Sequence, residues 1–189
     1  MSEPGSTGSL VVSGEELAAI TDRLGREITE DHPEGIVLVG LLKGSVCLAA
    51  DLVRSIEVSC SIDFLCLTPY GAGGQRVHLS KDLDVDVTGK DVVLAVDIVD
   101  RGLTVSYVHR LLTERGARSV DVCALLDRRV KRLLPVELRY VGRTIGEEYV
   151  VGYGLDLDER FRNLPDLRVI DPQQMKHAPP ASVELLFER

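Results

Sequence analysis

The chain has 189 residues, 44% of them hydrophobic and 28% charged, which fits one ordinary soluble domain with a sizeable core. Its formal net charge of −8 argues against binding to nucleic acid or an anionic membrane, because both need a broad basic face. A small anionic ligand is not excluded, since a few local donors and a metal ion can hold it. The polar N-terminus lacks a basic segment followed by an apolar core, so we expect a cytoplasmic protein without a signal peptide.

The first predicted helix covers residues 13–28, where apolar residues recur on one face. Ser13 can cap this helix, and Glu16 completes a capping box. A short buried strand is predicted over residues 35–42. A second helix is predicted directly after it, over residues 43–56.

Residues 58–66 alternate with a period of two, which predicts a half-buried strand. Residues 68–76 are rich in glycine and lack both periodicities, so we expect a mobile loop there. Residues 77–91 are predicted to be polar connecting structure in which a short strand can form. A buried strand then begins at Val92, and a helix follows from about Leu103 to Arg115, closed by Gly116.

Three further strands are predicted over residues 119–127, 136–142 and 149–154. Residues 1–9 are expected to form a flexible N-terminal tail, residues 10–172 one domain, and residues 173–189 a C-terminal tail. Strands that alternate with helices indicate an α/β fold with a largely parallel sheet. In such sheets ligands bind beyond the carboxyl ends of the strands.

One candidate site lies at such a strand end, in the stretch VVLAVDIVDRGLTV (residues 92–105). Asp97 and Asp100 stand where the strand meets the helix. Gly102 permits a tight turn with exposed N–H groups, and Thr104 adds a hydroxyl at the positive end of the helix. These features suit a phosphate monoester, with the carboxylates binding sugar hydroxyls or a metal ion. A purely structural alternative is that Asp100 only caps the helix.

Two common phosphate motifs do not fit this sequence. It contains no G-x-x-x-x-G-K-[ST] stretch. The glycine-rich segment GAGGQR lacks the last glycine of G-x-G-x-x-G, and we expect no helix after it. A P-loop or Rossmann nucleotide site is therefore not predicted.

The stretch VVLAVDIVDRGLT resembles the signature of the type I phosphoribosyltransferases, the strand and loop that bind phosphoribosyl pyrophosphate (PRPP). The resemblance runs from about residue 11 to 171 and is closest to the bacterial hypoxanthine (or hypoxanthine-guanine) enzymes. GLLKGSVCLAADL resembles their pyrophosphate-binding loop, YGAGGQRVHLSKDLDVDVTGKDV their flexible active-site loop, and YVVGYGLDLDERFRNLP their purine-binding segment. The resemblance implies the type I fold, a mostly parallel sheet flanked by helices, with a small hood subdomain.

The resemblance also implies the reaction and its residues. A 5-phosphoribosyl group would pass from PRPP to hypoxanthine or guanine with Mg²⁺, giving IMP or GMP and pyrophosphate in purine salvage, and the protein would be a homodimer or homotetramer. Asp100 matches the catalytic group that exchanges a proton with purine N7. The residues that match PRPP contacts are Lys43, Gly44, Asp97, Asp100, Arg101, Gly102, Leu103, Thr104 and Arg162. Those that match base contacts are Arg128, Tyr149, Val150 and Asp156. Asp97 and Asp156 match the metal positions, Tyr70 belongs to the flexible loop, and the Leu42–Lys43 bond is often cis in the family.

The sequence departs from the family pattern at five positions near the ligands. Val96 replaces the first of two adjacent acids, Arg101 a small hydroxyl residue, Pro69 a serine, Arg128 the lysine that reads the purine 6-oxygen, and Gly146 a proline.

Three interpretations of these departures stay open. The first is an active transferase, with usual or altered base specificity. The second is a PRPP- or nucleotide-binding regulator with low turnover. The third, a structural partner subunit, leaves the retained aspartates unexplained. The acidic chain has no spare DNA-binding segment, which favours the enzyme.

Overall fold

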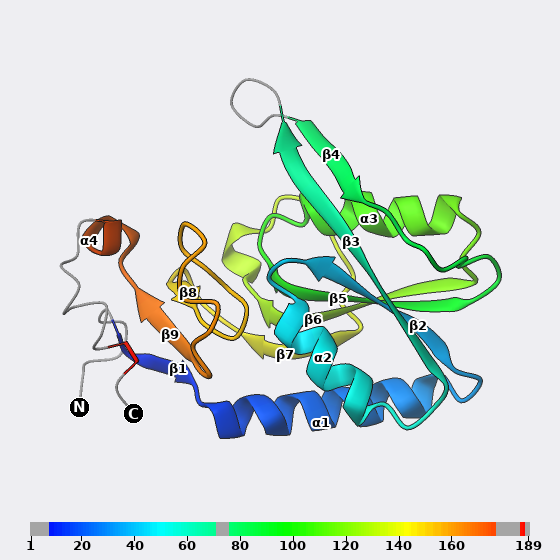
Figure 1. Cartoon of the computed structure of the whole chain (residues 1–189), viewed down its shortest axis with the longest axis horizontal. Helices are drawn as coiled ribbons and strands as arrows, with labels where there is room; N and C mark the ends of the chain where they lie inside the picture. The colour runs from blue at the N-terminus through cyan, green and yellow to red at the C-terminus, as the bar shows by residue number, and fades with distance from the viewer. Residues whose placement is uncertain (1–7, 71–75, 177–185, 188–189) are drawn as a thin grey trace.

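The structure is a computed structural model that describes residues 8–70, 76–176 and 186–187. A six-stranded sheet forms its centre, in the order β4-β3-β2-β5-β6-β7 (Figure 1). The strands are β2 (Ile36–Leu42), β3 (Cys60–Tyr70), β4 (Arg76–Lys81), β5 (Asp91–Val99), β6 (Ser119–Asp127) and β7 (Tyr140–Thr144). All neighbours are parallel except the β3–β4 pair, so the predicted α/β fold with a largely parallel sheet is confirmed.

Helices cover both faces of this sheet, and the central strand β5 is accordingly apolar on both sides. Val93 and Ala95 face the cluster formed with α1 (Gly14–Asp31) and α2 (Val46–Ser55). Val92, Leu94 and Val96 face the cluster formed with α3 (Leu103–Glu114). The alternation follows from the pleat of the strand, in which successive side chains point to opposite faces.

The ends of the predicted helices agree closely with the structure. Ser13 accepts a hydrogen bond from the Glu16 N–H while its own N–H donates to the Glu16 carboxylate, so the predicted capping box is confirmed. α3 ends before Gly116, whose φ of 82° is the left-handed conformation that glycine adopts freely. The second helix begins at Val46 and not at Lys43, because the residues between β2 and α2 form a turn.

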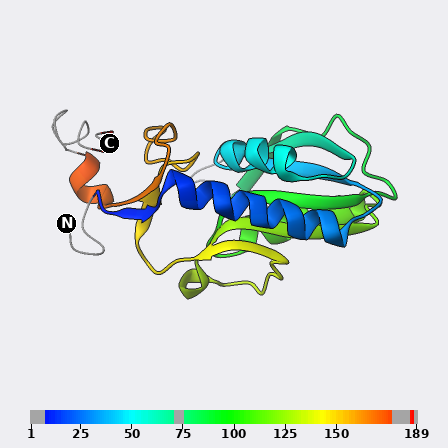
Figure 2. The same ribbon diagram turned by 90° about the horizontal axis from the view of Figure 1, so that it is seen from below.

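A second sheet of three short antiparallel strands, called the hood sheet here, lies at one end of the molecule (Figures 1 and 2). Its order is β1-β9-β8, with β1 at Leu10–Val12, β8 at Tyr149–Val151 and β9 at Leu167–Ile170. Neither β1 nor β9 was predicted, because strands of three and four residues are too short to show a period. The strand predicted over 149–154 ends at Val151, since the chain turns at Gly152 with a φ of 104°.

The loop predicted over residues 68–76 is wrong at both ends. β3 continues to Tyr70 and β4 begins at Arg76, with Pro69 opposite Val77. Proline is accepted here because β3 pairs with β2 only as far as Cys66, so the backbone beyond that point is bonded on one side. Residues 71–75, which hold the glycines, lie outside the described residues. The strand predicted over 136–142 is β7, shifted toward the C-terminus, after a short 3₁₀ helix at Arg129–Lys131.

The two predicted tails fall mostly outside the described residues. In the described part of the N-terminal tail, the Gly8 N–H donates to the Val169 carbonyl, and the Ser9 carbonyl accepts from the Val169 N–H. Met175, in α4 (Pro172–Lys176), and Leu186 are buried in a cluster beneath the hood sheet. No helix among the described residues is long and apolar enough to cross a membrane.

Candidate functional site

The carboxyl ends of the parallel strands meet at one edge of the central sheet and carry the predicted site. In the register, Gly40 pairs with Ala95, and Val99 pairs with Asp127. A cavity of about 150 Å³ opens here, between this edge and the hood sheet. It is lined by Asp97, Ile98, Asp100, Arg128, Tyr149, Val150, Leu155 and Asp156. Six of these eight are residues that the sequence singled out, so the fold brings distant segments of the chain together as predicted.

A groove of about 460 Å³ follows the loop between β5 and α3 and is lined by residues 98–105. Gly102 has a φ of 83° and precedes the first residue of α3, with no side chain capping the helix. A Cβ at this glycine would lie 2.9 Å from the Leu134 carbonyl oxygen and 2.8 Å from Val136. Position 102 therefore requires glycine for two reasons, the positive φ and the lack of space for a Cβ. The backbone N–H groups at the start of α3 are available to an anion.

Arg128 lies buried at the wall of the cavity, with 6% of its side chain exposed. Its Nη1 donates to both carboxylate oxygens of Asp100, at 2.9 and 3.1 Å, and its Nη2 donates to the Glu148 carbonyl oxygen at 2.6 Å. The buried Nε has no hydrogen-bond partner among the described residues. Arg128 is thus part of the predicted site and bonded to the predicted catalytic aspartate.

Gly146 stands next to this arrangement. Its N–H donates to the Glu148 carboxylate at 3.1 Å, while the Glu148 carbonyl accepts from Arg128. A proline at position 146, as the family pattern has it, would lack that N–H. The departures at positions 128 and 146 therefore belong to one connected arrangement.

Arg132 and Asp127 hold the loop between β5 and α3 in place. Neither residue was predicted from the sequence. The Arg132 Nε donates to the Asp100 carbonyl at 2.9 Å, and its Nη2 donates to the Val99 carbonyl and to the buried carboxylate of Asp127. Asp127 is the last residue of β6, next to the end of β5. An aspartate at the carboxyl end of the neighbouring strand was the available signal.

The loop after β2 approaches Asp97 from the other side. The peptide bond between Leu42 and Lys43 is cis, in keeping with the family pattern. A Cβ on Gly44 would lie 1.6 Å from the Asp97 Oδ2, and a Cβ on Gly154 would lie 2.1 Å from the Gly44 carbonyl oxygen. The backbone of this loop, the Asp97 carboxylate and the hood therefore meet at distances that only glycine allows.

Arg162 faces the same region from the hood. Its Nη1 donates to the Gly154 carbonyl at 2.7 Å, and its Nη2 lies 3.0 Å from the Asp156 Oδ1. The Glu159 Oε2 bridges two cations, at 3.0 Å from the Lys43 Nζ and 3.4 Å from the Arg162 Nη2. Glu159 is a further residue that sequence reasoning missed, and hydrogen bonding to Lys43 holds the pKa of its carboxyl below the usual value.

Electrostatics set Asp97 apart from the other carboxylates. Burial raises the pKa of Asp97 above its ordinary value, and the negative charge of Asp156 raises it further. Two backbone N–H groups and the charge of Arg162 act in the opposite direction but do not cancel the effect of burial. The ionised form of this carboxylate is thus disfavoured by its surroundings, and a bound cation would stabilise it.

The aromatic side of the cavity is Tyr149, at the start of β8, with 37% of its surface exposed. Its hydroxyl donates to the Asp156 carbonyl oxygen at 3.0 Å, which fixes the ring. Burial raises the pKa of this phenol above its ordinary value. Val150 follows, is buried in the core cluster and also lines the cavity.

Two sequence-predicted positions differ from the rest. Val96 is 1% exposed and packs in the apolar cluster on the α3 face, so its side chain does not point at the cavity that Asp97 lines. The backbone of Tyr70 pairs with Arg76 at the end of β3, and its side chain lies outside the described part of the structure.

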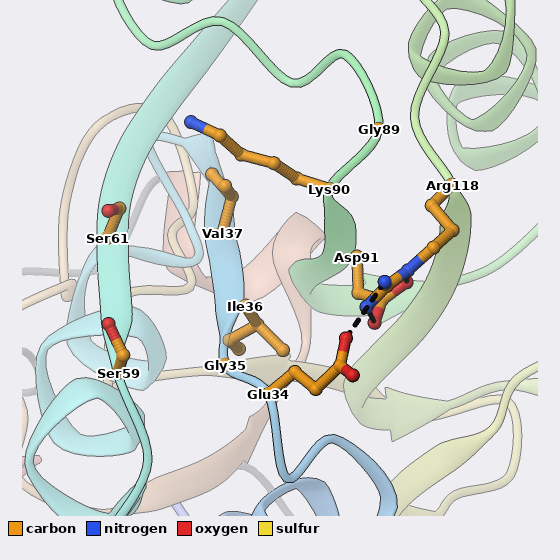
Figure 3. A pocket seen from close by; sticks show the side chains of 10 residues that line it. All are labelled: Glu34, Gly35, Ile36, Val37, Ser59, Ser61, Gly89, Lys90, Asp91 and Arg118. Atoms are coloured by element: carbon orange, nitrogen blue, oxygen red, sulfur yellow. Dashed lines mark hydrogen bonds and ion pairs between the residues drawn. The ribbon is translucent and has the colours of Figure 1, made fainter.

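Another cavity, of about 330 Å³, opens at the amino ends of the strands and contains none of the predicted site residues (Figure 3). Arg118 lies on its wall, where its Nε donates to Asp91 at 2.8 Å and its Nη1 to Glu34 at 2.9 Å (Figure 3). Because these charges neutralise one another, and parallel sheets bind ligands at the carboxyl ends, the candidate site remains at the opposite edge.

The fold combines a mostly parallel sheet, a glycine turn with exposed N–H groups after β5, and the hood sheet beside the carboxyl edge. This combination is typical of α/β proteins that bind nucleotides or sugar phosphates. Residues 11–158 match the family described as phosphoribosyl transferase domain. The chain therefore belongs to the phosphoribosyltransferase family, and the resemblance found in the sequence is confirmed.

Individual relatives narrow the comparison. The chain is 41% identical over 165 residues to hypoxanthine phosphoribosyltransferase of Escherichia coli (strain K12), covering 84% of this chain and 93% of that protein. It is 38% identical over 180 residues to hypoxanthine-guanine phosphoribosyltransferase of Mycobacterium tuberculosis (strain ATCC 25618 / H37Rv), covering 90% and 89%. A solved hypoxanthine-guanine phosphoribosyltransferase from Bacillus anthracis superposes with a TM-score of 0.83 at 36% identity, covering 86% of this chain and 98% of that one.

Proposed function

We propose that this protein transfers the 5-phosphoribosyl group of PRPP to hypoxanthine or guanine, giving IMP or GMP and pyrophosphate, a step of purine salvage. The observation that carries the proposal is the cavity that gathers Asp97, Asp100, Arg128, Tyr149 and Asp156 from three separate segments. The two relatives named above, which are hypoxanthine and hypoxanthine-guanine phosphoribosyltransferases, support it.

The phosphate and sugar of PRPP would occupy the groove along residues 98–105. Backbone N–H groups of Gly102, Leu103 and Thr104 bind the 5′-phosphate, with Arg101 adding a cation from the exposed side. Asp97 contacts the ribose hydroxyls.

The pyrophosphate group would lie between the two elements that meet at Asp97. The backbone of Lys43 and Gly44 contacts it on one side, and Arg162 on the other. Glu159, which bridges Lys43 and Arg162 in the structure, would exchange its contacts for those of the pyrophosphate.

The purine base would occupy the cavity of about 150 Å³. Its ring stacks on Tyr149, while the backbone of Val150 and the neighbouring Asp156 meet its edge. Arg128 faces the 6-oxygen. An arginine carries only donors, so it suits a 6-oxopurine better than a base with a 6-amino group.

The chemistry is a displacement at the ribose C1. The bond from purine N9 to C1 forms, the bond from C1 to the pyrophosphate oxygen breaks, and the N7 proton passes to the Asp100 carboxylate. Asp100 lies at the junction of the cavity and the phosphate groove, where both substrates would meet. A fixed carboxylate near C1 also stabilises the positive charge that develops there, because it needs no reorganisation of water.

The residues present fit a magnesium ion. Mg²⁺ is usually held by one or two carboxylates together with substrate phosphates and waters. Asp97 and Asp156 line the same cavity and supply two carboxylates, and because burial raises the pKa of Asp97, a cation there would favour its ionised form. Among the described residues, no group of three or more His, Cys, Asp or Glu side chains could hold a metal ion, so the other ligands would come from substrate and water. When bound, the ion would neutralise the leaving pyrophosphate.

A second candidate is a PRPP- or nucleotide-binding regulator with low turnover. One observation favours it, namely that the predicted catalytic Asp100 is bonded to Arg128 in the structure. Altered base specificity is a variant of the main proposal. A cytoplasmic place of action and assembly as a homodimer or homotetramer remain predictions.

A screen of purine bases with PRPP and Mg²⁺, read out as pyrophosphate release, tests the proposal. We expect turnover with hypoxanthine or guanine, or both, and none with adenine. Binding of PRPP measured by calorimetry, without pyrophosphate release for any base, would instead support the regulator.

A further inference from the structure

The contact between Arg128 and Asp100 joins two residues that the proposed function uses for different purposes. Asp100 is 39% exposed and follows β5, while Arg128 is almost fully buried and follows β6. Both Asp100 carboxylate oxygens lie within hydrogen-bond distance of one nitrogen of Arg128. The orientation of the Asp100 side chain is therefore set by Arg128.

Arg128 is itself held from behind. Its Nη2 donates to the Glu148 carbonyl at 2.6 Å, and Glu148 is fixed in turn by the Gly146 N–H. Two groups at a fixed separation match the planar fork of a guanidinium. A lysine carries its donors on a single nitrogen, so it cannot hold Asp100 and Glu148 in the same way.

The loop that carries Asp100 is also supported at its backbone. The Arg132 Nε donates to the Asp100 carbonyl at 2.9 Å, and Asp127 holds Arg132. Backbone and side chain of Asp100 are thus fixed by two arginines of one segment, residues 128–132, and of these only Arg128 reaches the carboxylate.

We propose that Arg128 is a positioning residue for Asp100, which aims the carboxylate at the purine while Glu148 anchors the arginine. This proposal rests on the proposed function, since it concerns the proton that Asp100 accepts. It makes the arginine at position 128 and the glycine at position 146 a matched pair. A misplaced catalytic group typically costs up to about 10²-fold in rate.

The test is a double-mutant cycle of steady-state kinetics with hypoxanthine or guanine. We expect Arg128→Lys to lower kcat about tenfold to a hundredfold, with the KM for PRPP within about twofold of wild type. In an Asp100→Asn background the same substitution should change kcat less than about threefold, because the group that it positions is already disabled. Arg139→Lys is the matched control, since this half-exposed arginine pairs with Asp31 away from the site and should retain full kcat.

Two results would overturn the proposal. One is an unchanged kcat in Arg128→Lys. The other is an equal loss in both backgrounds, which would mean that Arg128 acts on the base alone. Thermal unfolding of every variant shows whether a lower kcat comes from a folding defect. Arg128→Gln is a second substitution at the same position for the same purpose.

A readout without turnover separates this proposal from the proposed function. The unfolding free energies of wild type, Asp100→Asn, Arg128→Lys and the double variant should be non-additive if the two side chains are bonded. Additive values would count against the pair even if the enzyme is active. A crystal structure of the unliganded wild type with Asp100 turned away from Arg128 would also overturn it, and it needs no variant at all.

Discussion

Some charged side chains of the candidate site lower the stability of the folded protein, and bound ligand would offset this cost. Asp97 is the clearest case, because burial and the charge of Asp156 oppose its ionisation. Arg128 is another, because it is buried and leaves its Nε without a partner among the described residues. Functional sites commonly reduce stability in this way, since the compensating charge comes with the substrate.

Asp97→Asn should raise the thermal stability of the empty protein at neutral pH. An acid whose folded pKa is raised destabilises the fold as pH rises above its unfolded pKa, and the neutral amide removes that effect. The same variant should lose PRPP affinity and activity. Thermal unfolding at pH 7 with and without PRPP and Mg²⁺ measures both effects. A lower melting temperature for the empty variant would contradict this account of Asp97.

Asp100→Asn should lower kcat far more than it weakens PRPP binding. The amide keeps the shape but cannot accept the N7 proton, and general acid–base catalysis is typically worth about 10²–10⁴ in rate, or roughly 3–5 kcal/mol. Steady-state kinetics together with calorimetry of PRPP separate the two effects. A variant that keeps its rate and loses only PRPP affinity would make Asp100 a ribose ligand.

Arg101→Thr should weaken PRPP binding and reduce its dependence on salt, because it removes an exposed cation from the phosphate groove. Arg101→Lys is the control and should keep most of the salt dependence. Calorimetry at two salt concentrations measures both. A glutamate at position 96, where the family pattern has an acid, would instead place a charge in the core, because Val96 is 1% exposed. Unchanged affinity and salt dependence in Arg101→Thr would mean that the arginine points into solvent.

At the scale of elements, the candidate site lies where the carboxyl ends of β2, β5 and β6 meet residues 152–162, the segment after β8 that is called the hood segment here. Glycines allow these segments to approach one another closely. The β2–α2 loop passes Asp97 at Gly44, and the hood segment passes Gly44 at Gly154. The hood segment carries four non-glycine residues with positive φ, which shows how tightly this turn is bent: Tyr153, Asp158, Glu159 and Phe161. The Asp97 side chain and the backbone of Gly44 therefore limit the space at this junction.

Gly44→Ala should destabilise the protein and abolish PRPP binding. The added methyl would meet the Asp97 carboxylate at 1.6 Å, and overpacking of this kind typically costs about 1–3 kcal/mol. The double variant Gly44→Ala/Asp97→Ala should recover most of the lost stability, because the clashing carboxylate is gone. Denaturant unfolding of the three variants measures this. If the double variant is no more stable than Gly44→Ala, the backbone itself and not Asp97 limits the space.

At the scale of the whole molecule, the two edges of the central sheet have different roles. The carboxyl edge holds the site, with its uncompensated charges. The amino edge holds a network of compensated charges, in which Arg118 bonds to Asp91 and Glu34 (Figure 3). The buried His32 lies near Asp91 and Asp121 in the same network. The ion pairs of Arg118 are thus remote from the candidate site.

Arg118→Met should reduce stability at neutral pH and flatten its dependence on acid. The Arg118 guanidinium holds the pKa of Asp91 well below its usual range, so the pair stabilises the fold above the unfolded pKa of about 3.9 and this effect is lost as pH falls below it. The difference in melting temperature between wild type and variant should therefore shrink from pH 7 to pH 2. Phosphoribosyl transfer at neutral pH should be unaffected at a temperature where both are folded. A constant difference across this range would mean that the contribution is packing and not charge.

The sequence by itself determined the parts of this protein that depend on local pattern. The capping box at Ser13, the stop at Gly116 and the tight turn at Gly102 each need only a few adjacent residues. The alternation of strands and helices in the central sheet followed from periodicity, and four motifs identified the family. Asp97 and Asp100 were found because both lie in one short stretch.

Only the tertiary structure decided the contacts between distant segments. Arg128, Glu148 and Asp100 are far apart in the chain, and parallel pairing of β5 with β6 brings the first and last together. β1 and β9 exist because they pair with each other across the length of the chain, and Pro69 is accepted because β3 is bonded there on one side. Whether Val96 joins the site or the core depends on which face of the sheet α3 covers, and that is set by packing and not by any pattern in the sequence.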